Sequence, residues 1–233
     1  MLPTTKTKPK INLWEHVIFL YGAPKIGKST LASEIGGAMF LNTSGGLDSL
    51  EVFQLPIPDW ESFLVAGGEL LEGKHDFKVI VIDTIDRLHK LCTNFIIKQQ
   101  KVVHPQDLAY GKGYDMIKDE FIRPLTKLAL SQYGLILISH VKDIEIQTRT
   151  SKITRATPTL QNYAWEMIDG LTGIILYFSS ERREDGEKRI IRAYPSENWI
   201  AGDRTKRLVR AGDIIIQDDN QNWKRIEQAF EGG

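Results

Sequence analysis

The segment from Gly22 to Thr30, which reads GAPKIGKST, constrains the fold of this chain more than any other feature. Its beginning matches the pattern G-x-x-x-x-G-K-[ST], a loop whose backbone N–H groups point inward at a phosphate chain. The loop follows an apolar run, Val17 to Tyr21, and precedes a helical pattern in which Leu31, Ala32 and Ile35 share one face. Strand, loop and helix therefore come in the order that a phosphate-binding loop requires.

Two side chains of this loop are expected to contact the ligand directly. Lys28 can reach the terminal phosphates of a nucleotide, and the hydroxyl of Ser29 can bind Mg²⁺. Lys25 and Thr30 contribute chiefly through their backbone N–H groups. The predicted nucleotide-binding residues are Gly22, Ala23, Pro24, Lys25, Ile26, Gly27, Lys28, Ser29 and Thr30.

An acidic residue should provide the second metal contact from the tip of a strand beside the first. The apolar run Val79 to Ile82 ends at Asp83, which would place this carboxylate at the carboxyl edge of the sheet, where ligands bind in open α/β folds. Asp83 is predicted to hold Mg²⁺ directly or through water. Asp86, three residues further on, is interpreted as a helix cap or a charge on a helix face.

A further apolar run, Leu135 to Ile138, ends in Ser139 and His140. If this run is a strand of the same sheet, its tip faces the terminal phosphate. His140 is then a candidate to sense that phosphate or to orient a water molecule. The alternative is a histidine that simply caps a strand.

Strand-length apolar runs alternate with helical patterns along most of the chain. Runs that are apolar throughout suit strands covered on both faces, so the sequence predicts an α/β fold with a mostly parallel central sheet flanked by helices. A second helix is expected behind an Asp59 cap, and another is expected to be kinked or restarted at Pro124. The predicted strands are residues 17–21, 38–41, 79–82, 135–138 and 174–178; the second helix is expected to bury Trp60, Phe63, Leu64 and Leu71.

The pattern changes after about residue 172. Residues 184–187 read as a hairpin turn and are followed by an alternating stretch from Arg189 to Tyr194, which predicts an antiparallel C-terminal β extension. Ile214 to Ile216 could add a strand, and Trp223, Ile226 and Phe230 fall on one face of a closing helix. The chain is interpreted as a flexible basic N-terminus, residues 1–11, and a single domain, residues 12–233.

Composition narrows the function classes. Thirty Lys and Arg residues balance thirty Asp and Glu residues, so no global charge argues for a nucleic-acid partner and any such argument must be local. The single cysteine, Cys92, excludes an internal disulfide and a site of several thiolates. No apolar run approaches the roughly 18 residues that span a bilayer, and no signal peptide is evident, so a cytoplasmic protein is expected.

Four segments together resemble one family. They are Tyr21 to Thr30, Gly45 to Asp48 (GGLD), Val81 to Asp86 (VIDTID) and Gly202 to Leu208 (GDRTKRL). The combination is similar to the phage-encoded nucleotide-binding proteins of the Sak type, small RecA-like ATPases associated with single-strand annealing and recombination. The resemblance covers most of residues 12–210.

This resemblance implies a RecA-like core, ATP and Mg²⁺ as cofactors, and single-stranded DNA as the partner, in the cytoplasm of the host cell. It also implies possible assembly into a ring or filament and a possible single-strand-binding protein as a second partner. One departure bears on catalysis. RecA-like ATPases usually carry a water-activating glutamate after the second strand, where this chain has Ser44. A serine is no general base at neutral pH, so hydrolysis by the usual route is in doubt while nucleotide binding is not.

Local basic residues are the candidates for DNA and neighbour contacts. The segment 142–157 follows the strand that ends at His140 and corresponds, by the resemblance, to a DNA-contacting loop; its alternative is a solvated hairpin or flexible loop without a ligand. Arg204, in a polar turn with Lys206 and Arg207, is a candidate to reach the terminal phosphate of a neighbouring protomer; its alternative is an exposed charged turn. The candidate DNA-binding residues are Lys142, Arg149, Lys152 and Arg155.

Three functions are consistent with these features. The first is an ATPase that acts on single-stranded DNA, with Lys28, Asp83, His140 and Arg204 in its catalytic machinery. The second is a nucleotide-gated DNA-binding or scaffold protein with little hydrolysis. The third is a small-molecule kinase in which the segment 142–157 is a lid over a second substrate.

Overall fold

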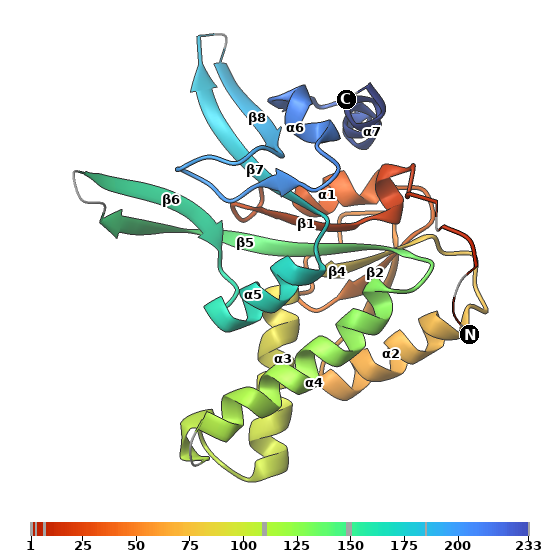
Figure 1. Ribbon diagram of the computed structural model, residues 1–233, viewed down its shortest axis with the longest axis vertical. Coiled ribbons are helices and arrows are strands. Elements are labelled where there is room, and N and C mark those ends of the chain that lie inside the picture. Colours follow the sequence, from red (N-terminus) through yellow and green to blue (C-terminus); the bar gives the residue numbers. More distant parts are fainter. Residues whose placement is uncertain are drawn as a thin grey trace.

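The computed structural model describes residues 2, 4–6, 8–108, 111–147, 151–184 and 186–232. A central sheet lies between two layers of helices (Figure 1). The strands are β1 (Val17–Gly22), β2 (Ala38–Asn42), β3 (Phe53–Pro56), β4 (Val79–Asp83), β5 (Gly134–Gln147), β6 (Lys152–Pro158), β7 (Ile174–Arg183), β8 (Gly186–Arg192), β9 (Gly202–Asp203) and β10 (Ile214–Ile216). The α-helices are α1 (Lys28–Ser33), α2 (Trp60–Glu72), α3 (Ile85–Gln100), α4 (Lys112–Ala129), α5 (Asn162–Leu171), α6 (Arg207–Ala211) and α7 (Asn222–Gly232), with short 3-10 helices η1 (Leu13–Glu15) and η2 (Pro105–Asp107).

The strand order confirms the predicted fold class. Along the sheet the order is β10-β8-β7-β1-β5-β4-β2-β3, with β6 paired to β5 and β9 paired to β7. The strands β7, β1, β5, β4, β2 and β3 pair in parallel, whereas β8, β10, β6 and β9 pair antiparallel to their neighbours. The chain has an α/β fold, with a mostly parallel central sheet flanked by helices and an antiparallel C-terminal extension.

The position of β4 differs from the sequence prediction. That prediction placed the strand ending at Asp83 directly beside β1, and it was wrong because β5 lies between them. In register, Gly22 pairs with His140 and Asp83 pairs with Ile138, so the ends of all three strands still lie at one edge. Both β4 and β5 are apolar and buried, so their pattern could not show which of them neighbours β1.

Alternating residues of each central strand enter two separate cores. On β1, Phe19 and Tyr21 pack with α2, α3, α4 and α5, whereas Ile18 and Leu20 pack with α1, α6 and α7. All four side chains are at most 1% exposed. The sheet is therefore covered on both faces, which accounts for strands without an apolar and polar alternation.

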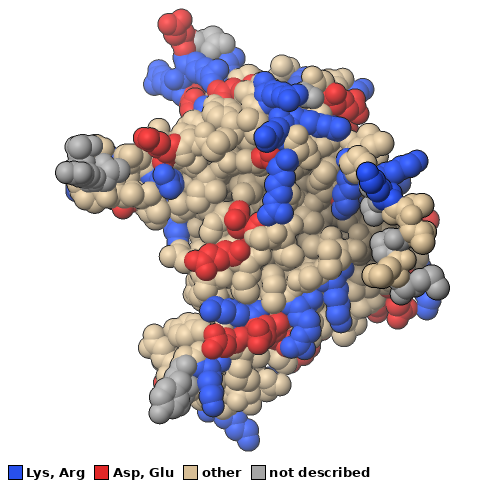
Figure 2. All heavy atoms as spheres, in the orientation of Figure 1, with Lys and Arg blue, Asp and Glu red and all other residues tan. Residues whose placement is uncertain are grey.

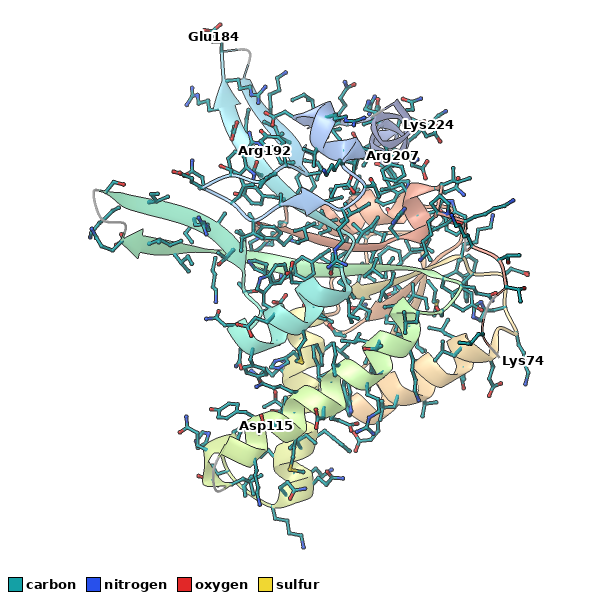
Figure 3. All side chains as sticks on the ribbon, viewed as in Figure 1. Lys74, Asp115, Glu184, Arg192, Arg207 and Lys224 are labelled. Atoms are coloured by element: carbon teal, nitrogen blue, oxygen red, sulfur yellow. The ribbon has the colours of Figure 1, made fainter. Side chains whose placement is uncertain are left out.

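Two long hairpins project from the carboxyl edge of the sheet (Figure 1). The β7–β8 hairpin was predicted, and basic side chains gather along it near the top of Figure 2, with Glu184 at its tip in Figure 3. The β5–β6 hairpin corrects the loop expected at residues 142–157, because the described part of this segment forms a strand pair, and its DNA contact stays a prediction. Its alternating Ile144, Ile146 and Ile153 carry the period-two signal of a strand, which the many polar residues obscured.

Contacts of the C-terminal extension bind it to the core. The hydroxyl of Tyr21 donates to the carbonyl of Ile200 (2.7 Å) and accepts from its N–H (3.0 Å). The Arg192 guanidinium, labelled in Figure 3, is 4.5 Å from the ring centre of Trp199. Arg192 also pairs with Glu181 (2.6 Å) and Asp213 (2.9 Å) and is 4% exposed. The hydrogen bonds of Tyr21 hold the extension against the strand that carries the phosphate-binding loop, whereas the contacts of Arg192 join parts of the extension to one another.

Smaller differences concern helices and one edge strand. The helix α2 begins after its predicted Asp59 cap, but Leu64 and Leu71 are 37% and 40% exposed rather than buried. Pro124 lies inside one helix, α4, which neither ends nor restarts there. The edge strand β3 was not predicted, since all four of its residues are exposed. Within the residues described, none of the helices combines the length and apolar character needed to cross a membrane.

The buried His89 makes the helical layer sensitive to acid. It is 4% exposed, its Nε2 lies 2.9 Å from the hydroxyl of Tyr163, and burial lowers its pKa to about 4. The unfolded chain, with an imidazole pKa near 6.5, binds the proton first as pH falls. The contribution of the neutral His89 side chain to the free energy of unfolding is thus fully present above about pH 6.5 and is lost as pH falls toward about 4.

We predict that His89→Gln reduces the acid loss of stability. The amide can still hydrogen-bond Tyr163 but does not titrate. Urea unfolding at pH 7 and at pH 4.5 should show a smaller difference in the free energy of unfolding for the variant than for the unmodified protein. His104→Gln, which replaces an exposed imidazole, is the control. An equal pH dependence in His89→Gln and the unmodified protein would contradict the prediction.

Candidate functional site

The phosphate-binding loop lies over a cavity of about 270 Å³ at the carboxyl edge of the sheet. Four segments of the chain line it: the loop with the start of α1, the turn after β2, the end of β4 and the end of the buried part of β5. The lining residues are Pro24, Lys25, Gly27, Lys28, Ser29, Thr30, Ser44, Gly46, Ser49, Leu50, Asp83, Thr84 and His140.

Two glycines of the loop are required by its geometry. Gly27 has a φ of 108° and forms the N-cap of α1, a conformation that side chains disfavour. A Cβ on Gly22 would lie 2.2 Å from the carbonyl oxygen of Phe178 on the neighbouring strand β7. The chain therefore packs tightly against β7 where it leaves β1 to form the loop. The loop then turns its backbone toward the cavity.

Lys28 is a buried cation at the floor of the cavity. It is 5% exposed, and its Nζ donates to the carbonyls of Gly22 (2.9 Å) and Ala23 (2.8 Å). Burial lowers the pKa of Lys28 to about 8, although Asp83 and Asp86 favour the charged form. A phosphate chain in this cavity would supply the negative charge that the ammonium now largely lacks.

Ser29 and Asp83 meet beside Lys28. The Ser29 hydroxyl donates to Oδ2 of Asp83 at 2.5 Å, so β4 reaches the loop although β5 separates it from β1. Burial raises the pKa of Asp83, and the hydrogen bond from Ser29 opposes that shift.

This pair of oxygens fits Mg²⁺. Among the described residues no group of three or more His, Cys, Asp or Glu side chains could hold a metal alone. Mg²⁺ is commonly bound by one or two protein oxygens together with phosphate oxygens and water. Ser29 and Asp83 would therefore hold the ion only together with a phosphate ligand, which it would help to bind and polarise.

His140 also reaches this cavity. Its Nδ1 lies 3.5 Å from Nζ of Lys28, and burial together with Lys28 lowers its pKa. The lowered pKa favours a neutral imidazole, which can accept a proton or a hydrogen bond. His140 lines the cavity, but the expectation that its strand ends there was wrong, because β5 continues to Gln147 as one arm of the β5–β6 hairpin. Its role with a phosphate stays a prediction.

Asp86 does more than the sequence analysis assigned to it. The cap of α3 is Thr84, so the interpretation of Asp86 as a cap was wrong. Its carboxylate accepts from the Ser139 hydroxyl (2.9 Å), the His140 N–H (3.2 Å) and the Thr159 hydroxyl (2.8 Å). Asp86 therefore joins α3, the end of the buried part of β5 and the return from the β5–β6 hairpin. Its spacing from Asp83 carried no signal for these contacts, because they form only when the end of the buried part of β5 and Thr159 pack against α3.

Ser44 borders the cavity as an exposed turn residue, and its hydroxyl lies 3.5 Å from the Asp83 carbonyl. Asp48, the nearest acidic residue in sequence, lines a different cavity beside β3. Among the described residues that line the phosphate cavity, Asp83 is the one carboxylate. No glutamate replaces the missing one at this position.

A family model described as an AAA domain matches residues 15–205. The chain belongs to this AAA domain family. No curated protein matches the chain. Two similar solved structures are a KaiC-like protein from the hyperthermophilic archaeon Pyrococcus horikoshii OT3 and the RadB recombinase. The first is 12% identical with a TM-score of 0.43 and covers 77% of this chain and 78% of that one; the second is 14% identical with a TM-score of 0.43 and covers 77% and 81%.

The candidate DNA-binding residues of the AAA domain do not share one surface. In the register of the β5–β6 hairpin, Lys142 and Arg155 lie on one face and Lys152 lies on the other. Lys152 pairs with Glu145 (3.5 Å), and Nε of Arg155 donates to the carbonyl of Glu197 (2.7 Å). Arg149 lies outside the described residues.

Arg204 lies at the opposite edge of the sheet from the phosphate cavity. It follows β9, which pairs with the first residues of β7, and its N–H donates to the carbonyl of Gly173 (3.0 Å). Its guanidinium donates to the last carbonyls of α5, at Asp169 and Gly170 (both 3.2 Å). Arg204 is therefore remote from the cavity of its own protomer, and a role at a neighbour's cavity stays a prediction.

We predict that Lys28→Met removes nucleotide binding without destabilising the empty AAA domain at pH 7. The ammonium loses solvation in the cavity, so its removal should leave the thermal unfolding temperature equal or higher. The folded pKa lies below the unfolded one, so the unmodified protein should gain stability relative to the variant as pH rises from about 8 to about 10.5. Thermal unfolding across this range, with and without Mg²⁺ and ATP, measures both effects. Stabilisation of Lys28→Met by ATP would contradict the binding role.

Proposed function

We propose that this AAA domain binds ATP with Mg²⁺, hydrolyses it slowly, and acts on single-stranded DNA in recombination or annealing. The observation that carries the proposal is the meeting of Lys28, Ser29 and Asp83 around one cavity. An ammonium, a hydroxyl and a carboxylate in this arrangement match the needs of a Mg²⁺-bound phosphate chain. A role in DNA recombination follows the phage-encoded proteins that the sequence resembles.

The hydrolysis step lacks its usual general base. A carboxylate next to the attacking water is typically worth about 10²- to 10⁴-fold in rate, and Ser44 provides none. His140 is the best placed substitute, because it reaches the cavity and its pKa is lowered. Slow turnover is therefore the expected state of the unmodified protein.

We expect Ser44→Glu to raise the turnover number while leaving ATP affinity nearly unchanged. The new carboxylate would border the cavity, and Lys28, Ser29 and Asp83 would stay in place. Steady-state phosphate release, with and without single-stranded DNA, measures turnover, and Ser44→Gln is the matched control without a base. Rapid hydrolysis by the unmodified protein that Ser44→Glu does not improve, but that His140→Ala removes, would assign water activation to His140 instead.

The β5–β6 hairpin is the proposed DNA contact. It extends the same strand that carries His140, from the same edge of the sheet as the phosphate cavity. Lys142 and Arg155 share one face, where they could neutralise backbone phosphates. Lys152 faces the other way and already has Glu145 as a partner.

Replacing both Lys142 and Arg155 by Ala should weaken single-strand binding with little dependence on base sequence. Each lost phosphate contact lowers the slope of log affinity against log salt by about 0.7 on single strands, so the pair should lower it by about 1.4. Fluorescence anisotropy over a range of salt concentrations gives the slope. Lys152→Ala is the control on the opposite face. Equal effects of the control and the pair would show that the hairpin has no DNA-binding face.

A second candidate function is nucleotide-gated DNA binding with hardly any hydrolysis, which the missing glutamate favours. A turnover number that stays near background with single-stranded DNA present, together with DNA affinity that depends on ATP, would favour it. Assembly into a ring or filament is a further proposal, in which Arg204 would act at a neighbour's cavity and a single-strand-binding protein would be a partner. The small-molecule kinase has no comparable support, since residues 142–147 and 152–158 form a strand pair rather than a lid.

A further inference from the structure

A second cavity, of about 160 Å³, adjoins the phosphate cavity. The two share Gly27 and Thr30, but Asp83 and His140 line only the first. A phosphate chain can therefore bind with its terminal end near Asp83 and run over Gly27 toward Thr30. Such a chain leads into the second cavity. In a nucleotide, the group attached at that end of the phosphate chain is the nucleoside.

Two parts of the chain that are far apart in sequence line this cavity. One is a single face of α1 and its ends, with Gly27, Thr30, Leu31 and Glu34 at helical spacing. The other is the C-terminal extension, which contributes Arg189 of β8 and residues between β10 and α7. The extension thus completes a site that begins at the phosphate-binding loop.

Arg189 gives the second cavity a fixed planar cation. One of its nitrogens, Nη1, donates to the carbonyl of Ile26 (3.3 Å), and Nη2 pairs with the carboxylate of Asp218. A Cβ on Gly27 would lie 2.9 Å from Nη1, so the guanidinium rests against the loop itself. Guanidinium planes held in this way stack on nucleobases.

Glu34 gives the second cavity a fixed acceptor. Its Oε2 accepts from the backbone N–H of Trp223 (2.7 Å), and its Oε1 accepts from the amide of Asn222 (3.1 Å). Asn222 is 5% exposed and also donates to the carbonyl of Gln217 (2.8 Å). A carboxylate has about four acceptor positions, so Glu34 can still accept from a hydroxyl or an amino group.

We infer that the second cavity binds the nucleoside half of the nucleotide. Arg189 stacks on the base, and Glu34 accepts a hydrogen bond from the ribose or from the edge of the base. The inference rests on the proposed function, because the phosphate chain must first bind at Lys28. It makes the C-terminal extension a part of nucleotide recognition.

Comparing ATP with inorganic tripolyphosphate tests the inference, because tripolyphosphate has no nucleoside. Isothermal titration in the presence of Mg²⁺ should show that Arg189→Ala weakens ATP roughly 5- to 150-fold, as expected for a lost stacking partner, and leaves tripolyphosphate unchanged. Arg189→Lys keeps the charge but not the plane, so it should lose most of the same factor. Arg182→Ala, which removes an exposed cation from the same hairpin, should change neither affinity. Should Arg189→Ala fail to fold, Arg189→Lys carries the test.

Three results would overturn the inference. The first is unchanged ATP affinity in both Arg189 variants. The second is an equal loss for ATP and tripolyphosphate, which would assign Arg189 to the phosphates. The third is an unmodified protein that binds ATP no more tightly than tripolyphosphate. Failure of the proposed function would give different results. In that case neither ATP nor tripolyphosphate binds the unmodified protein, or Lys28→Met weakens the binding of neither ligand.

Discussion

The burial of one ammonium group, that of Lys28, shapes the whole carboxyl edge of the sheet. A cation taken out of water needs oxygen partners, and here two backbone carbonyls of the loop provide them, while Asp83 and Asp86 lie near enough to favour the charge. The tight loop keeps those carbonyls within reach, and the close approach of Gly22 to β7 keeps the loop tight. The strand order matters for the same reason, because it brings the ends of β1, β5 and β4 to a single edge.

The sequence predicted the parts of this edge that depend on local pattern. The loop, the parallel strands and the acidic end of β4 are short segments whose residues carry their own signal. The parts that it missed depend on contacts between distant segments. Neither the insertion of β5 between β1 and β4 nor the three hydrogen bonds of Asp86 can be derived from spacing, since both arise only when the sheet assembles. The β5–β6 hairpin was hidden for a different reason, because its polar composition outweighed a weak alternation.

The C-terminal extension shows how an apparently separate element becomes part of a site. Sequence patterns described it only as antiparallel and rich in β structure. In the folded chain Arg192 binds its strands together, Tyr21 joins it to β1, and Arg189 contacts the loop through Ile26. At its other end the Arg207 guanidinium lies 4.8 Å from the ring centre of Phe230 and fastens α6 to α7. The extension and the loop are therefore in contact in the folded chain, even though no sequence motif connects the two.

The strand β5 has a mechanical consequence. It runs without interruption from Gly134 in the core to Gln147 in the hairpin, and His140 lies midway between the two. From His140 to Gln147 the arm is about 23 Å long at roughly 3.3 Å per residue. If this arm moved as a rigid unit, a tilt of about 10° at His140 would carry Gln147 through about 4 Å. Asp86 fixes the base of the arm, since it accepts hydrogen bonds from His140 and from Thr159, which directly follows β6. A displacement at the cavity that is too small to alter the fold would thus become a larger displacement at Gln147.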